Sequence, residues 1–397
     1  MSSVTSTVII PTYQRSRLLR QTLISIALQK TSQPFEVFVV DDGSTDDTAS
    51  VCESFAHDIN LHYLYQERHG FRAGQARNLG SCSASGNILI FLDAGMIVPS
   101  WFVDAHVASH ATSAIGVTIG YDPGYNHLLS QATIWNGAPE SIDQAITDAT
   151  LEPTLYDMRE SWFKRYADVL SRSPIPWNYC WGGNVSMLRT VFLQLGGFDP
   201  TFTTWGLEDV ELARRAWVAG FTFRLRRDAA ALELPHGRDL DALWPSFQHN
   251  ANLMLSKHVD PYVELSTIAP FEDVEDLALY AQALIGYPPT RSKVLLSQLV
   301  PYDIPSNAWA IVGCRNVPTR TSPSICFNPH FKTSNQSPHD SLSVTLPLFG
   351  ARIPFPEDIF ECCYVGEDVK QYPTLLREGI ITEASRVSRL TPTGPGI

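Results

Sequence analysis

Apolar and polar residues follow two different patterns over the first hundred residues of the chain. Short apolar runs rich in Val, Ile and Phe are typical of buried strands, and apolar residues at helical spacing are typical of amphipathic helices. The predicted strands lie at residues 8–10, 35–40, 61–65 and 88–92, and the predicted helices at residues 18–26, 44–55 and 74–84. This repetition of strand and helix predicts an α/β fold with a mostly parallel central sheet and helices on both of its faces.

Polar and turn-forming residues follow three of the predicted strands. They are Pro11, Thr12 and Tyr13 after the first strand, Asp41 and Asp42 after the second, and Asp93 with Ala94 after the fourth. Ligands of open parallel sheets bind outside the carboxyl ends of the strands. We therefore expect these residues to line one binding site. The alternative for Asp42 is a turn residue that precedes Gly43.

A second acidic position stands in the stretch Trp-Gly-Leu-Glu-Asp-Val-Glu at residues 205–211, after a Gly-Gly-Phe-Asp turn. Glu208 and Asp209 are predicted to begin a helix that continues through Trp217, where the positive end of the helix dipole favours carboxylates. A carboxylate that follows loop glycines can reach a cleft and take a proton from an incoming nucleophile. The alternative is an acidic first turn that only caps the helix.

The rest of the chain carries weaker patterns. The predictions are a strand at residues 115–121, a turn at 122–126, helical content within 128–154, and helices at 161–170, 243–255 and 274–285. Beyond residue 287 the frequent prolines predict an ordered but irregular accessory region. Residues 386–397 are expected to fray.

Composition limits the class of protein. The chain has 397 residues, of which 44% are hydrophobic and 18% charged, so it is predicted to be globular with room for two or three domains. Its formal net charge of -12 argues against a general nucleic-acid binder. No stretch reaches the roughly 18 apolar residues of a membrane-spanning helix. The seven cysteines show no zinc-like pairing, and with the polar N-terminal residues they favour a cytoplasmic location.

Four fragments, in this order and spacing, resemble the nucleotide-sugar-binding half of family 2 glycosyltransferases, which have the GT-A fold. They are Ile-Pro-Thr-Tyr at residues 10–13, Val-Asp-Asp-Gly-Ser-Thr-Asp at 40–46, Ala-Arg-Asn-Leu-Gly at 76–80 and Phe-Leu-Asp at 91–93. The resemblance implies that residues 11–13 line the base pocket and that Asp42 or Asp41 binds the uracil or ribose. It also implies that Arg77 approaches the diphosphate or braces a loop. Carboxylate acceptors and an Arg fork suit these ligand groups, while a purely structural salt bridge is the alternative for Arg77.

The chain departs from this family at the end of the fourth strand. The family usually carries Asp-x-Asp there, and the two acids hold a divalent cation that neutralises the leaving diphosphate. The stretch here is Asp93-Ala94-Gly95, and a single carboxylate is a poor anchor for Mg²⁺ or Mn²⁺. Residues 234–239 resemble the His-x-Arg-Asp segment of β-1,4-galactosyltransferases, which implies that His236 joins Asp93 as a ligand of Mn²⁺. The alternatives are a loop histidine without a metal, and a metal-independent enzyme in which Arg238 stabilises the diphosphate.

Residues 182–221 resemble the galactosyltransferase-type segment of β-1,4-galactosyltransferases, chondroitin-polymerase domains and polypeptide N-acetylgalactosaminyltransferases. This resemblance implies that Asp209 is the general base of an inverting transfer, since retaining relatives tend to carry Glu-Asn instead of Glu-Asp. It also implies that Glu208 binds donor or acceptor hydroxyls. The predicted acceptor or sugar contacts are Trp181, Gly182, Gly183 and Trp205. For the aromatic residues at 177–181, a buried cluster is the alternative.

The sequence therefore predicts a GT-A domain at residues 1–240, with a nucleotide-sugar half (1–105) and an acceptor half (106–240). An accessory region follows at residues 241–397. Its predicted role is to cover the cleft, to bind a large acceptor or to form a homodimer. The predicted donor is a UDP-sugar, and the acceptor is a glycan, lipid carrier, peptide or small metabolite. The alternatives are a metal-independent enzyme that uses another nucleotide sugar, and a catalytically silent homologue, which Gly95 motivates. A nucleotidyltransferase would be expected to have a Gly/Arg-rich loop that residues 12–18 lack.

Overall fold

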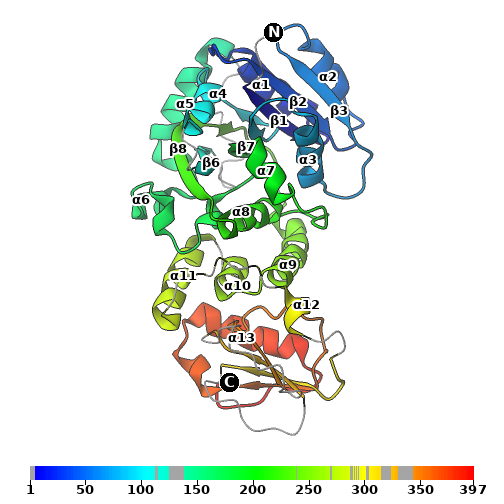
Figure 1. Ribbon diagram of the computed structural model, residues 1–397, viewed down its shortest axis with the longest axis vertical. Coiled ribbons are helices and arrows are strands. Elements are labelled where there is room, and N and C mark those ends of the chain that lie inside the picture. The colour runs from blue at the N-terminus through cyan, green and yellow to red at the C-terminus, as the bar shows by residue number, and fades with distance from the viewer. Residues whose placement is uncertain are drawn as a thin grey trace. The chain divides into compact units, whose positions relative to one another are not determined.

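A computed structural model describes residues 5–111, 115–124, 138–237, 239–268, 271–286, 289, 291, 293, 295–300, 304–313, 323–329 and 343–397. The chain divides into two compact units, residues 1–247 and residues 248–397. Figure 1 draws the first unit in blue to green and the second in yellow-green to red.

The first unit is built on a seven-stranded sheet with the order β3-β2-β1-β4-β7-β6-β8. All neighbouring strands are parallel except β7, which is antiparallel to both β4 and β6. The strands are β1 (Ser6–Thr12), β2 (Phe35–Asp41), β3 (Leu61–Tyr65), β4 (Ile88–Leu92), β6 (Ile115–Tyr121), β7 (Asn184–Leu188) and β8 (Thr222–Ala230). This mixed α/β architecture confirms the predicted fold class.

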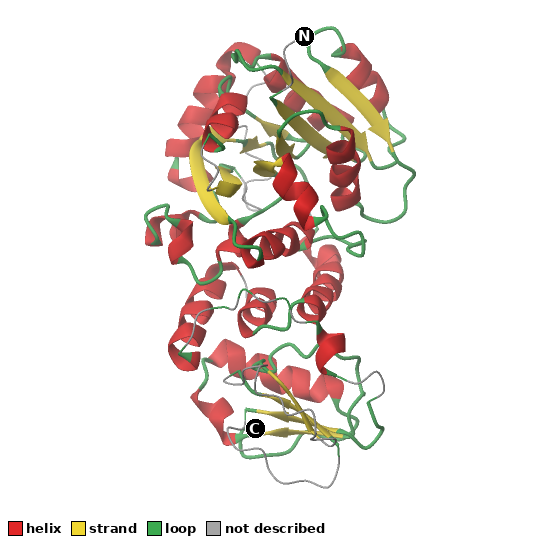
Figure 2. Ribbon diagram, in the orientation of Figure 1, coloured by secondary structure: helices red, strands yellow, loops and turns green. Residues whose placement is uncertain are grey.

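Helices cover both faces of this sheet (Figure 2). On one face, Val8 and Ile10 of β1 are fully buried and pack in a cluster with Leu19 of α1 (Ser16–Ala27). Ile9 points to the opposite face, where α3 (Ala73–Ser83) approaches so closely that a Cβ on Gly80 would lie 2.7 Å from the Ile9 side chain. Burial of one such aliphatic side chain contributes about 1.5–3 kcal/mol. The apolar runs in the sequence are therefore the strands of a two-sided core.

The other elements of the first unit are α2 (Thr48–Ser54), α4 (Phe102–Ser109), α5 (Ile142–Leu151), α6 (Glu160–Arg165), α7 (Arg189–Leu195), α8 (Glu208–Val218), and the short pair β5 (Met96–Ile97) and β9 (Leu232–Glu233). Among them, α2, α5, α6 and α8 lie in segments that were predicted to be helical, whereas α4, α7, β5 and β9 were not predicted. The helix predicted over 161–170 is wrong in its second half, because α6 ends at Arg165 and Ala167 and Asp168 adopt positive φ angles. Residues 125–137 of the predicted turn and helix lie outside the described residues.

The second unit contains a regular structure that the sequence analysis missed. Four parallel strands form a sheet with the order β12-β11-β10-β13. They are β10 (Trp309–Val312), β11 (Ser324–Phe327), β12 (Ser343–Leu346) and β13 (Cys362–Val365). The expectation of irregular structure beyond residue 287 is therefore wrong. Each strand has only four residues, the shortest length over which a strand pattern can be read, and the frequent prolines obscured that weak signal.

Helices complete the second unit. They are α9 (Leu240–Lys257), which crosses the boundary between the units, α10 (Pro261–Ile268), α11 (Phe271–Ile285), α12 (Leu296–Leu299) and α13 (Thr374–Val387). The helices predicted at 243–255 and 274–285 are confirmed by α9 and α11. The expectation that residues 386–397 fray is wrong, because Ser388 and Thr393 form β-bridges with Phe360 and Tyr364.

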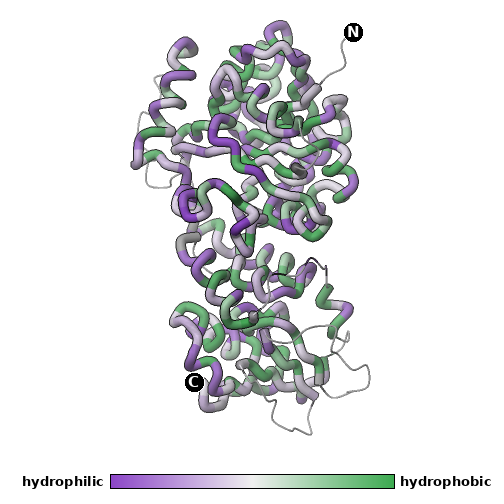
Figure 3. Tube along the Cα trace, turned by 60° about the vertical axis from the view of Figure 1, so that its left-hand side comes forward, coloured by the Kyte–Doolittle hydropathy of each residue, from purple (hydrophilic) through white to green (hydrophobic). Residues whose placement is uncertain are grey.

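Hydropathy changes over short distances along both units, and green and purple segments follow one another along the trace (Figure 3). Within the described part of the chain, no helix combines the length and the apolar character that crossing a membrane requires.

Candidate active site

The predicted donor-side residues lie at the carboxyl ends of neighbouring parallel strands. The register pairs Thr12, the last residue of β1, with Asp41, the last residue of β2. The amide of Asp42 then donates to the carbonyl of Thr12 at 2.9 Å. Asp93 follows directly after β4, which pairs in parallel with β1 on its other side. These strand ends therefore share one edge of the sheet, where ligands of such folds bind.

The two acids after β2 have different surroundings. Asp41 is 1% exposed, and it accepts hydrogen bonds from the Ser44 amide at 2.7 Å and from the Tyr63 hydroxyl at 2.8 Å. Asp41 therefore closes the turn after β2. Asp42 accepts from the side-chain amide of Gln66 at 2.6 Å and forms an ion pair with Arg68. The main-chain amide of Arg72 also donates to it at 3.2 Å, so the buried Asp42 carboxylate is held by residues 66–72 rather than by its own turn.

The loop after β3 contributes a residue that the sequence analysis missed. The Arg68 guanidinium lies 3.8 Å from the ring centroid of Tyr13, which is 38% exposed. Beside it, the hydroxyl of Thr12 is buried and has no hydrogen-bond partner among the described residues. A Cβ on Gly43, whose φ is +90°, would lie 2.6 Å from the Arg68 Cβ, so glycine permits this approach. The signal available in the sequence was that this loop follows a third strand to the same edge.

Arg77 on α3 joins the two halves of the site. Its guanidinium is buried and donates to Asp93 Oδ1 at 2.8 Å and to Glu208 Oε1 at 3.2 Å. The amide of Asp93 donates to the carbonyl of Gly183 at 3.0 Å. A Cβ on Gly182 would lie 3.0 Å from the guanidinium carbon of Arg77. The acid after β4, the start of α8 and the Gly182–Gly183 pair therefore surround one arginine.

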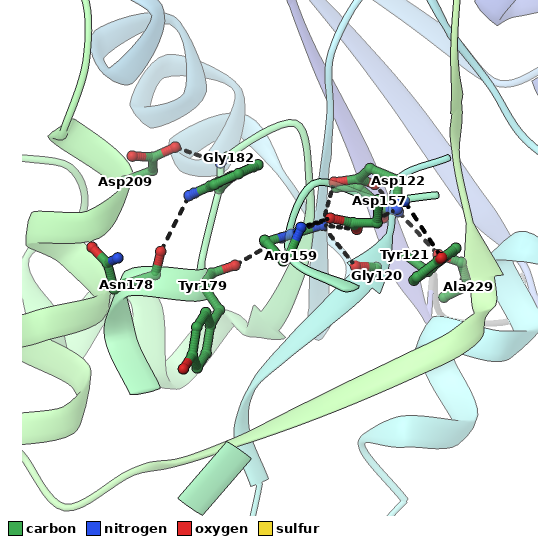
Figure 4. A network of polar contacts seen from close by, with 12 residues as sticks. Gly120, Tyr121, Asp122, Asp157, Arg159, Asn178, Tyr179, Gly182, Asp209 and Ala229 are labelled. Atoms are coloured by element: carbon green, nitrogen blue, oxygen red, sulfur yellow. Dashed lines mark hydrogen bonds and ion pairs between the residues drawn. The ribbon is translucent and has the colours of Figure 1, made fainter. Parts of the chain in front are cut away.

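Asp209 lies beside this arginine with part of its side chain accessible. The loop before it turns through Gly206 and Leu207, which have φ angles of +101° and +67°. Asp209 Oδ2 accepts a hydrogen bond from the Gly182 amide at 2.6 Å (Figure 4). Asp209 Oδ1 accepts from the Val210 amide at 2.8 Å. Glu208 is buried whereas Asp209 is half-buried, so Asp209 is the acid with access to a ligand.

The pair of acids holds protons more strongly than carboxyl groups in water. Burial raises the pKa of Glu208 to about 7, and the neighbouring charge of Asp209 adds to this effect. Burial also raises the pKa of Asp209, against the hydrogen bond from the Gly182 amide and the charge of Arg77. A carboxylate whose pKa lies closer to neutrality is a better proton acceptor than an ordinary one.

The aromatic residues around Gly182 divide into two groups. Trp177 and Tyr179 are fully buried, and Trp177 packs against Trp217 with ring centroids 4.9 Å apart. For these two residues the buried-cluster alternative applies. Trp181 and Trp205 are half-buried, so part of the surface of each stays accessible.

The predicted metal ligands sit on adjacent segments, but they form no complete coordination set. The amide of Leu234 donates to the carbonyl of Gly95 at 2.9 Å, which brings the His236 segment against the turn after Asp93. His236 Nδ1 lies 3.1 Å from the carbonyl of Leu234. Within the described ranges, no group of three or more His, Cys, Asp or Glu side chains is placed to hold an ion. Two protein ligands suit only an ion that takes its other positions from phosphate and water. Arg238 lies outside the described residues.

Gly95 has a structural reason to replace the second acid. Its φ of +106° lies in a region that L-residues with side chains rarely adopt. Its amide donates to the Thr22 hydroxyl at 2.9 Å, and its carbonyl accepts from Leu234. The turn after β4 is therefore fixed by its main chain.

The chain is similar to known families and proteins. A family model described as glycosyl transferase family 2 matches residues 7–191, and one described as the N-terminal domain of galactosyltransferase matches residues 169–236. The chain is 37% identical over 264 residues to validoxylamine A glucosyltransferase of Streptomyces hygroscopicus subsp. jinggangensis (strain 5008), covering 65% of this chain and 62% of that protein, which is less than two thirds of its length.

Two further proteins are similar over more of their length. Validoxylamine A glucosyltransferase of Streptomyces hygroscopicus subsp. limoneus is 37% identical over 404 residues, covering 96% of this chain and 88% of that one. The crystal structure of S. aureus TarS 1–349 in complex with UDP-GlcNAc superimposes with a TM-score of 0.47 and 20% identity, covering 72% of this chain and 73% of that one.

Proposed function

Because the chain belongs to the family 2 glycosyltransferases, we propose that it transfers a sugar from a UDP-sugar to an acceptor hydroxyl with inversion, and that Asp209 is the general base. The two relatives named validoxylamine A glucosyltransferase make UDP-glucose the first donor to test and validoxylamine A the first acceptor.

One observation carries this proposal. Arg77 contacts both the acid after β4 and Glu208, and the next residue, Asp209, is held by the amide of Gly182. The strand edge that suits a nucleotide sugar and the acid that suits an acceptor hydroxyl are therefore parts of one cluster. An acceptor between Asp93 and Asp209 would have a base on one side and the leaving group on the other.

The reaction follows from this arrangement. The acceptor oxygen forms a bond to the anomeric carbon while the bond from that carbon to the diphosphate oxygen breaks, and the diphosphate leaves with the electron pair. Asp209 takes the acceptor proton as its oxygen attacks. Glu208 is buried against Arg77, so its role is to hold that arginine in place rather than to bind sugar hydroxyls as the sequence predicted.

The donor would lie along the strand edge. Tyr13 and Arg68 offer a flat surface for the base, and the free hydroxyl of Thr12 and the carboxylate of Asp42 offer hydrogen bonds to it. Asp93 and His236 would hold a divalent cation, which would neutralise charge on the diphosphate. Arg77 offers a second positive charge near Asp93.

The test is the purified chain with UDP-glucose and validoxylamine A, followed by release of UDP and by the mass and anomeric configuration of the product. The proposal expects a product with inverted configuration. A product of retained configuration would contradict Asp209 as the base. Binding of UDP-glucose without UDP release, with or without added Mn²⁺, across a panel of nucleotide sugars and acceptors would support the catalytically silent homologue instead.

A further inference from the structure

A buried ion cluster lies behind the loop that carries Gly182. We propose that Arg159, with Asp122 and Asp157, is a positioning residue for glycosyl transfer, because it fixes residues 179–184 so that the Gly182 amide donates to Asp209. This inference rests on the proposed function of Asp209. Arg159 itself is fully buried, and its hydrogen bonds are to Asp122, Asp157, Tyr179 and Gly120 rather than to Asp209.

Arg159 uses its whole guanidinium within this cluster (Figure 4). Its Nε donates to Asp157 Oδ1 at 2.9 Å, and one terminal nitrogen lies 2.6 Å from Asp157 Oδ2 and 2.7 Å from Asp122 Oδ2. The other terminal nitrogen donates to the carbonyl of Tyr179 at 2.7 Å. A planar fork with five N–H donors satisfies this set, and a lysine ammonium does not.

The cluster contacts the residues before Gly182. Besides binding the carbonyl of Tyr179, the Arg159 guanidinium lies 4.7 Å from the ring centroid of Trp181. The indole N–H of Trp181 donates to the carbonyl of Asn178 at 3.1 Å. Tyr179 and Trp181, which lie shortly before Gly182 in the chain, are therefore both held by contacts with Arg159.

The same cluster contacts the first residue of β7, directly after Gly183. Asp122 Oδ1 accepts a hydrogen bond from the side-chain amide of Asn184 at 2.9 Å. That amide also donates to the carbonyl of Ala229 at 2.9 Å, and Asn184 Oδ1 lies 3.0 Å from His106 Nε2. Gly182 and Gly183 thus span two anchors that meet at the pair of Arg159 and Asp122. Because two glycines have no side chains to hold their segment, these anchors add to the main-chain bonds of Gly182 with Asp209 and of Gly183 with Asp93.

Arg159 is linked to the proposed base, Asp209, through one hydrogen bond of the loop that it holds. The Gly182 amide lies 2.6 Å from Asp209 Oδ2. A donor to the charged form of a carboxylate favours that form, so loss of this bond raises the pH at which Asp209 becomes a base. The other titratable groups around Asp209 are Glu208 on its own helix, Arg77 on α3, Cys180 in the loop, and Asp93 through Arg77.

The test compares two Arg→Lys variants. Arg159→Lys is expected to shift the acid limb of the pH profile of kcat for UDP-glucose turnover upward by about one pH unit, since one hydrogen bond to a charged group is lost. The KM for UDP-glucose is expected to stay within about twofold, because the donor contacts lie on the strand edge. Arg215→Lys is the matched control. Arg215 lies on the same helix as Asp209 and forks onto Glu211 and two carbonyls, but it makes none of the contacts to residues 179–184 described above.

An acid limb that stays at the wild-type pH in folded Arg159→Lys would overturn the proposal, even if kcat falls equally at every pH. If that variant does not fold, Asp122→Asn decides by the same criterion, and failure of both to fold would assign the cluster a structural role only. Wild-type turnover by Asp209→Asn would instead refute the proposed function, and the two failures are distinguishable.

Discussion

Both units contain a sheet with parallel strands, and the buried glutamates Glu208 and Glu264 are held in different ways. In the first unit, Glu208 is paired with the guanidinium of Arg77, which also pairs with the partly exposed Asp93. In the second unit, the buried carboxylate of Glu264 accepts hydrogen bonds from the main-chain amides of Phe349 at 2.6 Å and Ala351 at 2.7 Å.

The difference separates a reactive arrangement from a structural one. A side-chain cation can keep one contact while a ligand approaches another, as Arg77 does between the strand edge and α8. Main-chain amides fix a carboxylate to a single loop, and residues 349–352 are held to α10 in this way. The residues that follow the strands show a related difference between the units. Asp42 and Asp93 follow β2 and β4 in the first unit, whereas Gly313 and Gly366 follow β10 and β13 in the second.

The largest expected effect tests the reactive side of this comparison. Asp209→Asn keeps the shape of the side chain but removes the base, so kcat is expected to fall by about 10²–10⁴-fold. The measurement is UDP release at saturating UDP-glucose. Asp228→Asn, which removes an exposed acid paired with Arg226, is the control that should keep wild-type kcat. Equal kcat in the two variants would contradict the assignment of Asp209.

The next effect concerns the stability of the arginine-paired cluster. Arg77→Met leaves the buried Glu208 without its cation, so the free energy of unfolding of the first unit is expected to fall by about 3–5 kcal/mol. Urea denaturation measures this loss. It should be largest near pH 8 and smaller near pH 5, because Glu208, with its raised pKa, is protonated at low pH. A loss that does not change with pH would argue that Arg77 acts through packing alone.

A smaller effect is expected in the second unit. Burial raises the pKa of Glu264 to about 7, so its contribution to stability is present at low pH and is lost as the pH rises through neutrality. The free energy of opening that hydrogen exchange reports for the amides of residues 349–352 should therefore fall by roughly 1–3 kcal/mol between pH 4 and pH 8, after correction for intrinsic rates. Glu264→Gln should remove this dependence and leave kcat unchanged. A persistent dependence in that variant would point to another group.

The smallest effect tests the donor edge. The Thr12 hydroxyl has no partner to lose within the described structure, so Thr12→Val should leave stability unchanged and raise the KM for UDP-glucose by about 2–10-fold through one lost hydrogen bond. Thr7 on the same strand donates to Glu36 at 2.7 Å. Thr7→Val should show the reverse pattern: it should lower stability and leave the KM for UDP-glucose unchanged. Unchanged KM in Thr12→Val would remove the hydroxyl from the predicted base pocket.

Local patterns in the sequence were enough to predict the strands β1, β2, β3, β4 and β6 of the first sheet, but not β7 and β8, and they placed Asp209 at the start of a helix. Each strand of the donor half is an apolar run, and a parallel sheet brings the residues after those runs to one edge. The helix at Glu208 follows loop glycines that are visible in the sequence. These features depend on residues close together in the chain.

Contacts between distant residues could not be predicted in this way. Arg77 and Glu208 are 131 residues apart, and nothing near either residue indicates the other. Arg159 meets Asp122 across 37 residues that carry no strong periodic pattern. The four-residue strands of the second unit are at the lower limit of length for the period-2 signal. The sequence therefore indicated the candidate acids and Arg77, but not the contact between Arg77 and Glu208, nor the parts played by Arg68 and Arg159.

The glycine after Asp93 and Ala94 bears on attempts to engineer the site. With a φ of +106°, Gly95 lies beyond the left-handed helical region that Asp tolerates. Replacing it with Asp would not by itself recreate an Asp-x-Asp motif, because the main chain would have to rotate and give up its bonds to Thr22 and Leu234. Transplanting a two-acid metal site into this protein would require exchange of the whole turn together with the segment that pairs with it.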